Sequence, residues 1–146
     1  MKKRATAGFT LVELLVVLAI MTILATYAYP GYQEHVSKTR RTEGQILLLD
    51  VIAKEERFFT ENNTYTLDLT DLGYALNLDG ELETESGFYG ITANACNVGG
   101  VDLPITNCVQ LTATPPAGSP QINDGSLSIN SRNQKSRTQG ANTFDW

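Results

Sequence analysis

The sequence predicts an α+β protein in which one long N-terminal helix packs on a small antiparallel sheet of three to four strands. Three observations lead to this prediction. An apolar run of membrane length lies near the start, helical periodicity continues well beyond it, and short segments of alternating polarity follow. With 146 residues and one apolar run, the chain has room for one globular domain.

The apolar run extends from Gly8 to Tyr29, and as a helix it is long enough to cross a hydrocarbon core of about 30 Å. Glu13 is its one charged residue. Because an unpaired carboxylate in a membrane is unfavourable, Glu13 predicts a partner charge. A simple anchor helix is the alternative, and it leaves Glu13 unexplained. A secretory signal is not favoured, because no small-residue cleavage site follows the run before Pro30.

Helical periodicity continues past Pro30, so we expect one helix from Phe9 to about Glu61. Gly44 weakens its second half. Apolar residues there recur every three or four positions and predict the buried stripe: Ile46, Leu49, Ile52 or Ala53, and Phe59. Residues 64–85 read as a loop that packs on the helix through Tyr65, Leu67, Leu69, Leu72 and Tyr74.

Three segments with period-two alternation predict strands, and Gly, Pro and Asn residues separate them: Phe88–Cys96, Cys108–Thr114 and Ser126–Ser131. The expected inward residues are Tyr89, Ile91, Ala93, Ala95, Val109, Leu111, Ala113, Leu127 and Ile129. Residues 132–146 are polar until Phe144 and Trp146, which we expect to hold the C-terminus down.

The two cysteines, Cys96 and Cys108, follow the apolar run. The basic residues Lys2, Lys3 and Arg4 are expected to stay in the cytoplasm, which places the cysteines in an oxidising compartment and predicts a disulfide. Free thiols are the alternative. In the expected alternation neither cysteine occupies an inward-facing position of its strand. The bridge is therefore expected on the outer sheet face or at a loop base.

The segment Gly8-Phe9-Thr10-Leu11-Val12-Glu13 resembles the class III signal of type IV prepilins and of the related pseudopilins. The resemblance implies that a prepilin peptidase cuts between Gly8 and Phe9 and methylates the new terminal amine. Residues 1–8 would then be a leader, 9–30 the transmembrane and polymerisation half of the helix, and 31–146 the head domain. In the family, the glutamate at the position of Glu13 neutralises the terminal amine of an adjacent subunit.

Downstream segments are similar to PilE-like minor pilins of type IVa pili: residues 41–45, 56–65, 109–115 and 126–132. Many major pilins close a loop with cysteines near the chain end, whereas 38 residues follow Cys108 here. The resemblance therefore implies a minor pilin that supports pilus biogenesis, twitching motility, adhesion and DNA uptake. It also implies other pilin subunits, the prepilin peptidase and the inner-membrane assembly machinery as partners. The subunit would reside in the bacterial inner membrane, with its head in the periplasm, before it joins an extracellular pilus.

An enzyme is not expected, because the single histidine, His35, lies just beyond the membrane segment and no catalytic triad can be drawn. A DNA-uptake receptor is the main alternative, carried by Arg132, Lys135 and Arg137. The formal net charge of −5 argues against a general nucleic-acid binder, and a solvated strand end is the favoured reading of these three residues.

A pseudopilin of type II secretion is the third alternative. Four carboxylates at every second position are weak candidates for calcium ligands: Asp79, Glu81, Glu83 and Glu85. A solvated loop edge is the favoured reading, so no metal and no cofactor is predicted.

Overall fold

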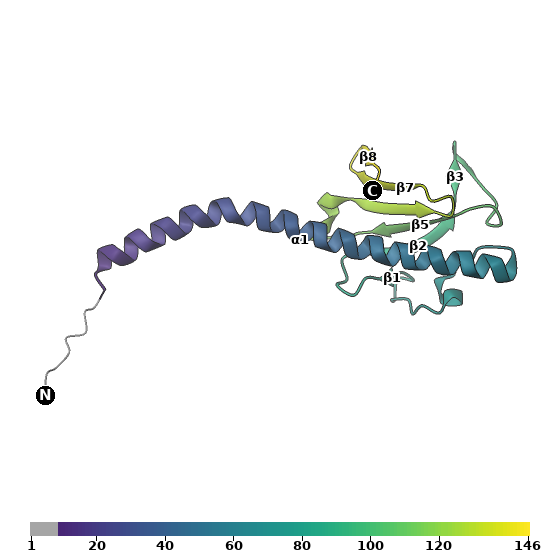
Figure 1. Cartoon of the computed structure of the whole chain (residues 1–146), viewed down its shortest axis with the longest axis horizontal. Coiled ribbons are helices and arrows are strands. Elements are labelled where there is room, and N and C mark those ends of the chain that lie inside the picture. Colours follow the sequence, from purple (N-terminus) through teal and green to yellow (C-terminus); the bar gives the residue numbers. More distant parts are fainter. Residues whose placement is uncertain (1–8) are drawn as a thin grey trace, which may run out of the picture. The chain divides into compact units, whose positions relative to one another are not determined.

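A computed structural model describes residues 9–146 and contains one long helix, α1 (Leu11–Asn62), followed by a region rich in strands (Figure 1). The remaining elements are the short 3-10 helices η1 (Leu69–Leu72) and η2 (Pro120–Asp124) and eight strands: β1 (Leu82–Glu83), β2 (Gly90–Ala95), β3 (Asn97–Val98), β4 (Val101–Asp102), β5 (Val109–Thr114), β6 (Ser126–Asn130), β7 (Lys135–Gln139) and β8 (Asn142–Phe144). The predicted long helix and antiparallel sheet are confirmed.

The chain falls into two compact units, one that ends at Val36 and one that comprises Ser37–Trp146. In the first unit, α1 is apolar and is the one helix in residues 9–146 that is long and apolar enough to cross a membrane. Pro30 lies inside the helix without ending it.

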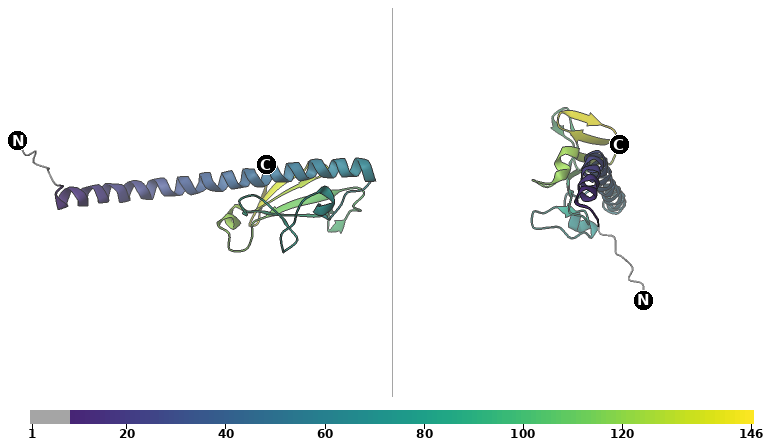
Figure 2. Two further views of the ribbon diagram at one scale, coloured as in Figure 1. Left: turned by 90° about the horizontal axis from the view of Figure 1, so that it is seen from below. Right: turned by 90° about the vertical axis from the view of Figure 1, so that its left-hand side faces the viewer.

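In the second unit, the continuation of α1 covers one face of the sheet (Figure 2). The main sheet has six antiparallel strands in the order β1-β2-β5-β6-β7-β8, and β3 and β4 form a separate hairpin. The predicted sheet of three to four strands is therefore too small. Strands β1, β7 and β8 were missed because β1 has two residues and neither β7 nor β8 shows apolar alternation.

The buried face of α1 also differs from the prediction. Its buried residues are Gly44, Leu48, Val51 and Glu55, whereas the predicted Ile46 is 63% exposed. Leu49, also predicted, is 42% exposed, whereas the predicted Ile52 packs against the core and Phe59 stacks on Tyr65. The stripe is shifted because the glycine that seemed to weaken the helix faces the sheet. A Cβ atom at that glycine would lie 3.1 Å from the ring of Tyr89, so a larger residue would keep the helix off the sheet.

The core lies between this face of α1 and the sheet. Seven of the nine predicted inward strand residues are buried, and Ala93 and Ala95 are partly buried, so the predicted inward register is confirmed. Tyr65, Leu69, Leu72 and Tyr74 pack as expected, but Leu67 is 52% exposed and its predicted packing is wrong. Trp146 packs against the core, and its Nε1 donates to the carbonyl oxygens of Ser128 and Ser136 at 3.2 and 2.8 Å. The predicted anchoring of the C-terminus is confirmed for Trp146, whereas Phe144, the other predicted residue, is 43% exposed.

Candidate functional site

The start of α1 holds Glu13 in a reciprocal pair with Thr10. The Thr10 backbone N–H and hydroxyl donate to Oε2 of Glu13 at 3.0 and 2.9 Å, and the Glu13 N–H donates to the Thr10 hydroxyl oxygen at 3.2 Å. This is a capping box, in which two side chains satisfy backbone donors that the helix start leaves open. Gly8 lies outside the described residues, and Phe9 is exposed.

The capping box was missed by the sequence analysis, although its signal, Thr-x-x-Glu before an apolar run, is present at Thr10–Glu13. The pair fixes the direction of the carboxylate toward the N-terminal end of the helix. Since a carboxylate accepts about four hydrogen bonds, Glu13 keeps capacity for a further donor. It is therefore placed to receive a cation near the helix start.

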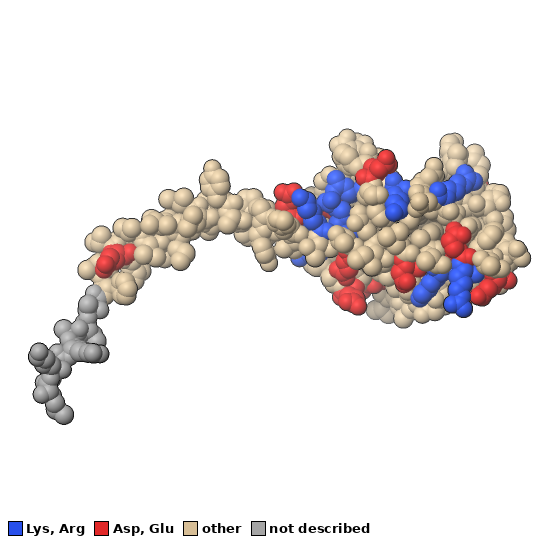
Figure 3. All heavy atoms as spheres, in the orientation of Figure 1, with Lys and Arg blue, Asp and Glu red and all other residues tan. Residues whose placement is uncertain are grey.

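The surface behind Glu13 is apolar on all sides. From Leu11 to Leu24 every large hydrophobic side chain is more than half exposed. The sequence from Phe9 to Tyr29 has Glu13 as its one charged residue, and the face seen in Figure 3 is almost free of acidic and basic side chains along this part of the helix. Such a surface is unfavourable in water and favours burial in lipid or against another apolar surface.

The three basic residues predicted as a DNA-binding stretch lie in different surroundings. Arg132 is exposed in the turn between β6 and β7, and Nζ of Lys135 lies 5.1 Å from the ring centroid of Trp146. The Arg137 side chain is 17% exposed, and its Nη1 lies 3.3 Å from Oδ1 of Asp124. Arg137 is thus held in an ion pair inside the head.

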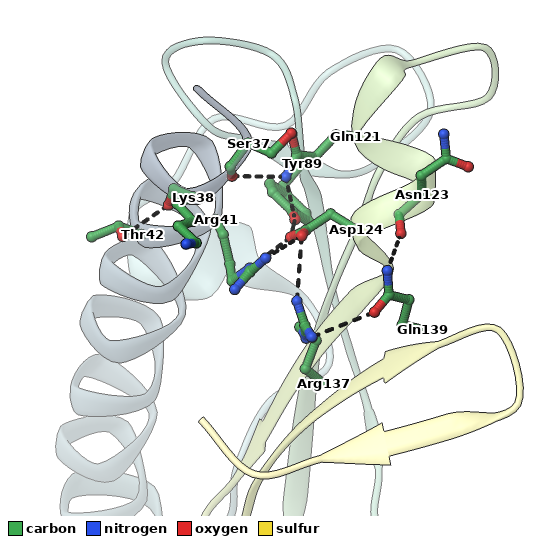
Figure 4. A network of polar contacts seen from close by, with 10 residues as sticks. All are labelled: Ser37, Lys38, Arg41, Thr42, Tyr89, Gln121, Asn123, Asp124, Arg137 and Gln139. Carbon is green, nitrogen blue, oxygen red and sulfur yellow. Dashed lines mark hydrogen bonds and ion pairs between the residues drawn. The ribbon is translucent and has the colours of Figure 1, made fainter. Parts of the chain in front are cut away.

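That ion pair belongs to a polar network around Asp124, which sequence patterns did not predict (Figure 4). Arg41 of α1 binds the carboxylate through two nitrogens, with Nε 2.7 Å from Oδ2. The Tyr89 hydroxyl donates to Oδ2 at 3.2 Å. The Gln121 amide donates to the Tyr89 hydroxyl and to the carbonyl of Ser37, at 3.2 and 3.0 Å. The network joins α1, η2 and β7.

Two opposing effects act on the pKa of Asp124. Burial raises it, but the hydrogen bonds and charge of Arg41, with the Tyr89 hydroxyl and Arg137, outweigh burial and hold the pKa below its ordinary value. The carboxylate therefore stays ionised between its guanidinium partners, and the network has a structural role.

The acidic run is not gathered around a centre. Asn77 organises it, because its Oδ1 accepts from the backbone N–H groups of Asp79 and Glu81 and its Nδ2 donates to Glu83 at 3.0 Å. Glu85 is exposed in the following turn. Within residues 9–146, no three histidine, cysteine or acidic side chains lie close enough together to hold a metal ion.

The predicted disulfide between Cys96 and Cys108 is confirmed, with a Cα–Cα distance of 5.5 Å. The two residues lie directly beyond the paired ends of β2 and β5, so the bridge closes the base of the loop that carries the β3–β4 hairpin. Of the two predicted positions, the loop base is therefore correct. A closed loop of this size stabilises the fold by about 3 kcal/mol in the chain-entropy model.

Glu55 is a fully buried carboxylate that the sequence analysis missed. Its Oε2 accepts from the backbone N–H of Thr66 at 3.1 Å, and its Oε1 has no partner among the described atoms. Burial raises the pKa of Glu55 to about 7. The hydrogen bond from Thr66 lowers the pKa, and the negative charges of Glu56 and Asp71 raise it further. Glu55 lies at helical spacing from the other buried residues of α1, Gly44, Leu48 and Val51, and this spacing is the signal that could have identified it.

Comparison with protein families gives two adjoining matches. Residues 30–126 match the family described as "Type IV minor pilin ComP, DNA uptake sequence receptor". Residues 3–29 match the "Prokaryotic N-terminal methylation motif".

Individual relatives point in the same direction. The chain is 28% identical over 120 residues to the type IV major pilin protein PilA of Myxococcus xanthus, covering 82% of this chain and 50% of that protein. It is 31% identical over 97 residues to the type IV major pilin protein PilE of Neisseria gonorrhoeae, covering 62% and 58%. A type IV pilin structure from Shewanella oneidensis is 17% identical, with a TM-score of 0.45 over 75% of this chain and 99% of that one. The chain spans about half the length of the curated relatives it matches.

Proposed function

The chain belongs to the type IV pilin family, and from this premise we propose that it acts as a minor pilin, a structural subunit that supports pilus assembly and twitching motility. No catalytic step is part of this role. Its partners are other pilin subunits, major and minor, and the assembly machinery of the bacterial inner membrane.

The proposal begins with processing. The prepilin peptidase removes residues 1–8 and methylates the amine of Phe9, and the match of residues 3–29 to the methylation motif supports this step. The mature subunit then waits in the inner membrane, with the apolar part of α1 in lipid and the head in the periplasm. It leaves the membrane as it joins the extracellular pilus.

The observation that carries the proposal is an apolar helix surface whose large side chains are more than half exposed among the described residues, with one carboxylate at its start. On assembly, neighbouring helices replace the lipid around this surface. The amine of Phe9 on an adjacent subunit then pairs with Glu13, which the Thr10 hydrogen bonds already hold in place. Because an unpaired charge in a dry interior is strongly unfavourable, the pair fixes the axial position of the incoming subunit.

Mass spectrometry of pili sheared from cells tests the proposal. We expect a peptide that starts at methylated Phe9, in an amount well below that of the main subunit. Full-length protein that remains in the membrane and is absent from sheared pili would contradict the proposal. An amount equal to that of the main subunit would contradict the minor role and leave the pilin role intact.

A second candidate function, a DNA-uptake receptor, is favoured by the description of the family that residues 30–126 match. Two basic side chains outside the Asp124 network are the candidates to contact phosphates, Arg132 and Lys135. We expect DNA affinity that falls steeply with salt and decreases when both residues are changed to alanine. The exposed Arg57, changed to alanine, is the matched control. Affinity that is unchanged in the double variant would remove these residues from the DNA site.

A further inference from the structure

One edge of the main sheet is only partly occupied. Strand β1 pairs its two residues with Gly90 and Ile91, the first two residues of β2. In the part of the chain that the structure describes, no strand pairs with residues 92–95 on this side, although β5 accompanies β2 along its full length on the other side. Four residues of β2 therefore form an open edge.

The backbone of this edge presents hydrogen-bonding groups. The Thr84 N–H donates to the carbonyl of Tyr89 at 3.0 Å, which places the backbone groups of Tyr89 on the β1 side. In an antiparallel ladder the direction alternates, so Ile91, Ala93 and Ala95 point their N–H and C=O groups to the same side. The groups of Ala93 and Ala95 thus face the open edge, where they can pair with a further strand.

A hollow of about 450 Å³ lies along the edge. Its volume is within the range of about 300–1,000 Å³ that is typical of ligand sites. Three leucines of the loop after α1 line it on one side and residues of β2 on the other: Leu67, Leu69, Leu76, Thr92, Ala93 and Asn94. The exposed Leu67, which failed to pack in the core as predicted, contributes its side chain to this hollow.

The charges around the hollow are negative. Asp68 lines it, and hydrogen bonds from the hydroxyl and N–H of Thr70 keep the pKa of Asp68 below its ordinary value, so this residue is ionised at neutral pH. Gly80, another lining residue, lies between Asp79 and Glu81 in the sequence. No lysine or arginine is among the described lining residues. A second copy that paired with the same edge would bring these acids together, whereas a basic segment would neutralise them.

We infer that the open edge of β2 and the adjoining hollow form a docking site for an extended, basic segment of a partner protein, which adds a strand in line with β1. Backbone hydrogen bonds to Ala93 and Ala95 would hold the segment. Alternate side chains would point to opposite sheet faces, so that apolar ones enter the leucine-lined hollow and basic ones remain near the acidic rim. This site does not depend on the proposed role in pilus assembly.

The test uses the full chain in detergent micelles and the peptide acetyl-Lys-Val-Lys-Val-Lys-amide. Hydrogen exchange, followed residue by residue by NMR, reports on the edge. We expect the amides of Ala93 and Ala95 to exchange at least tenfold more slowly with saturating peptide. The amides of β8, at the other sheet edge, should not change.

Matched controls separate strand addition from charge attraction. The peptide acetyl-Glu-Val-Glu-Val-Glu-amide and a version of the basic peptide with alternate N-methylated residues should give no protection. Asp68→Asn keeps the cap of η1 and should weaken binding severalfold at low salt. Ala93→Pro removes an edge-facing N–H that the β2–β5 ladder does not use, and should abolish binding.

Three results would overturn the inference. In the first, saturating basic peptide leaves the exchange of the Ala93 and Ala95 amides unchanged. In the second, the N-methylated peptide protects these amides as well as the basic peptide does. In the third, the amides are protected without peptide, and this protection increases with protein concentration. The last result would assign the edge to a second copy of this chain.

Discussion

Replacing the buried Glu55 with glutamine should stabilise the head at high pH and not at low pH. The side chain is 0% exposed, and one of its oxygens has no partner in the described structure. Glutamine keeps the shape and a carbonyl oxygen that can accept from Thr66, but it removes the charge. The effect therefore isolates the cost of ionising a carboxylate in the core.

The magnitude follows from the pKa of Glu55, which is about 7 in the fold and 4.5 in the unfolded chain. Because the folded state binds the proton more tightly, the free energy of unfolding decreases as pH rises from 4.5 to 7 and stays low above that. At about 1.4 kcal/mol per tenfold difference, the loss is about 3 kcal/mol. Glu55→Gln should recover about this amount at pH 8 and almost nothing at pH 4.

The assay is urea unfolding of the full chain in detergent with the disulfide intact, followed by the fluorescence of Trp146, the single tryptophan, which packs against the core. The exposed Glu61, changed to glutamine, is the control and should show no such pH dependence. Other groups titrate over the same range, so the difference between variant and wild type is the quantity to compare. An equal difference at pH 4 and pH 8 would refute the reasoning.

Three further predictions concern packing, charge and capping. Asp124→Asn should lower the free energy of unfolding by about 2 kcal/mol at pH 7, because Arg41 and Arg137 lose their shared partner. Since the pKa of Asp124 is depressed, urea titrations should show that the difference from wild type shrinks as pH falls below 4. A difference that does not shrink would contradict this prediction. Gly44→Ala should destabilise the head by about 1 kcal/mol despite the better helix propensity of alanine, because the new Cβ lies 3.1 Å from the buried ring of Tyr89. Gly31→Ala, which has open space around its Cβ, should stabilise the helix in the same thermal melt. Thr10→Ala should reduce the amount of subunit in sheared pili severalfold while Thr10→Ser restores it, and equal amounts for both variants would exclude a positioning role for the hydroxyl.

The sequence predicted what depends on local periodicity. The long helix and the inward faces of β2, β5 and β6 follow from apolar spacing and are found as expected, although Ala93 and Ala95 of β2 are only partly buried. The disulfide followed from the membrane orientation and the compartment it implies. The role of Glu13 followed from its place in an apolar run, and it remains a prediction.

What the sequence did not predict depends on contacts between distant segments. From the sequence, Gly44 was interpreted as a weak point of the helix. In the structure the ring of Tyr89 packs against this position, which explains why the buried face of the helix includes it. Strand β7 carries Lys135 and Arg137 at inward positions, so its pattern does not look amphipathic. Arg137 is paired with Asp124, a residue from another element, and a local sequence pattern cannot show this contact.

The central claim is that Glu13 is kept in an apolar helix because it pairs with the amine of a neighbouring subunit. The most direct test is to compare Glu13→Leu and wild-type protein in cells by measuring how much of each is cleaved at Phe9 and how much is present in sheared pili. We predict that the variant remains in the membrane and is at least tenfold depleted from pili. Processing and incorporation at wild-type levels would contradict the claim.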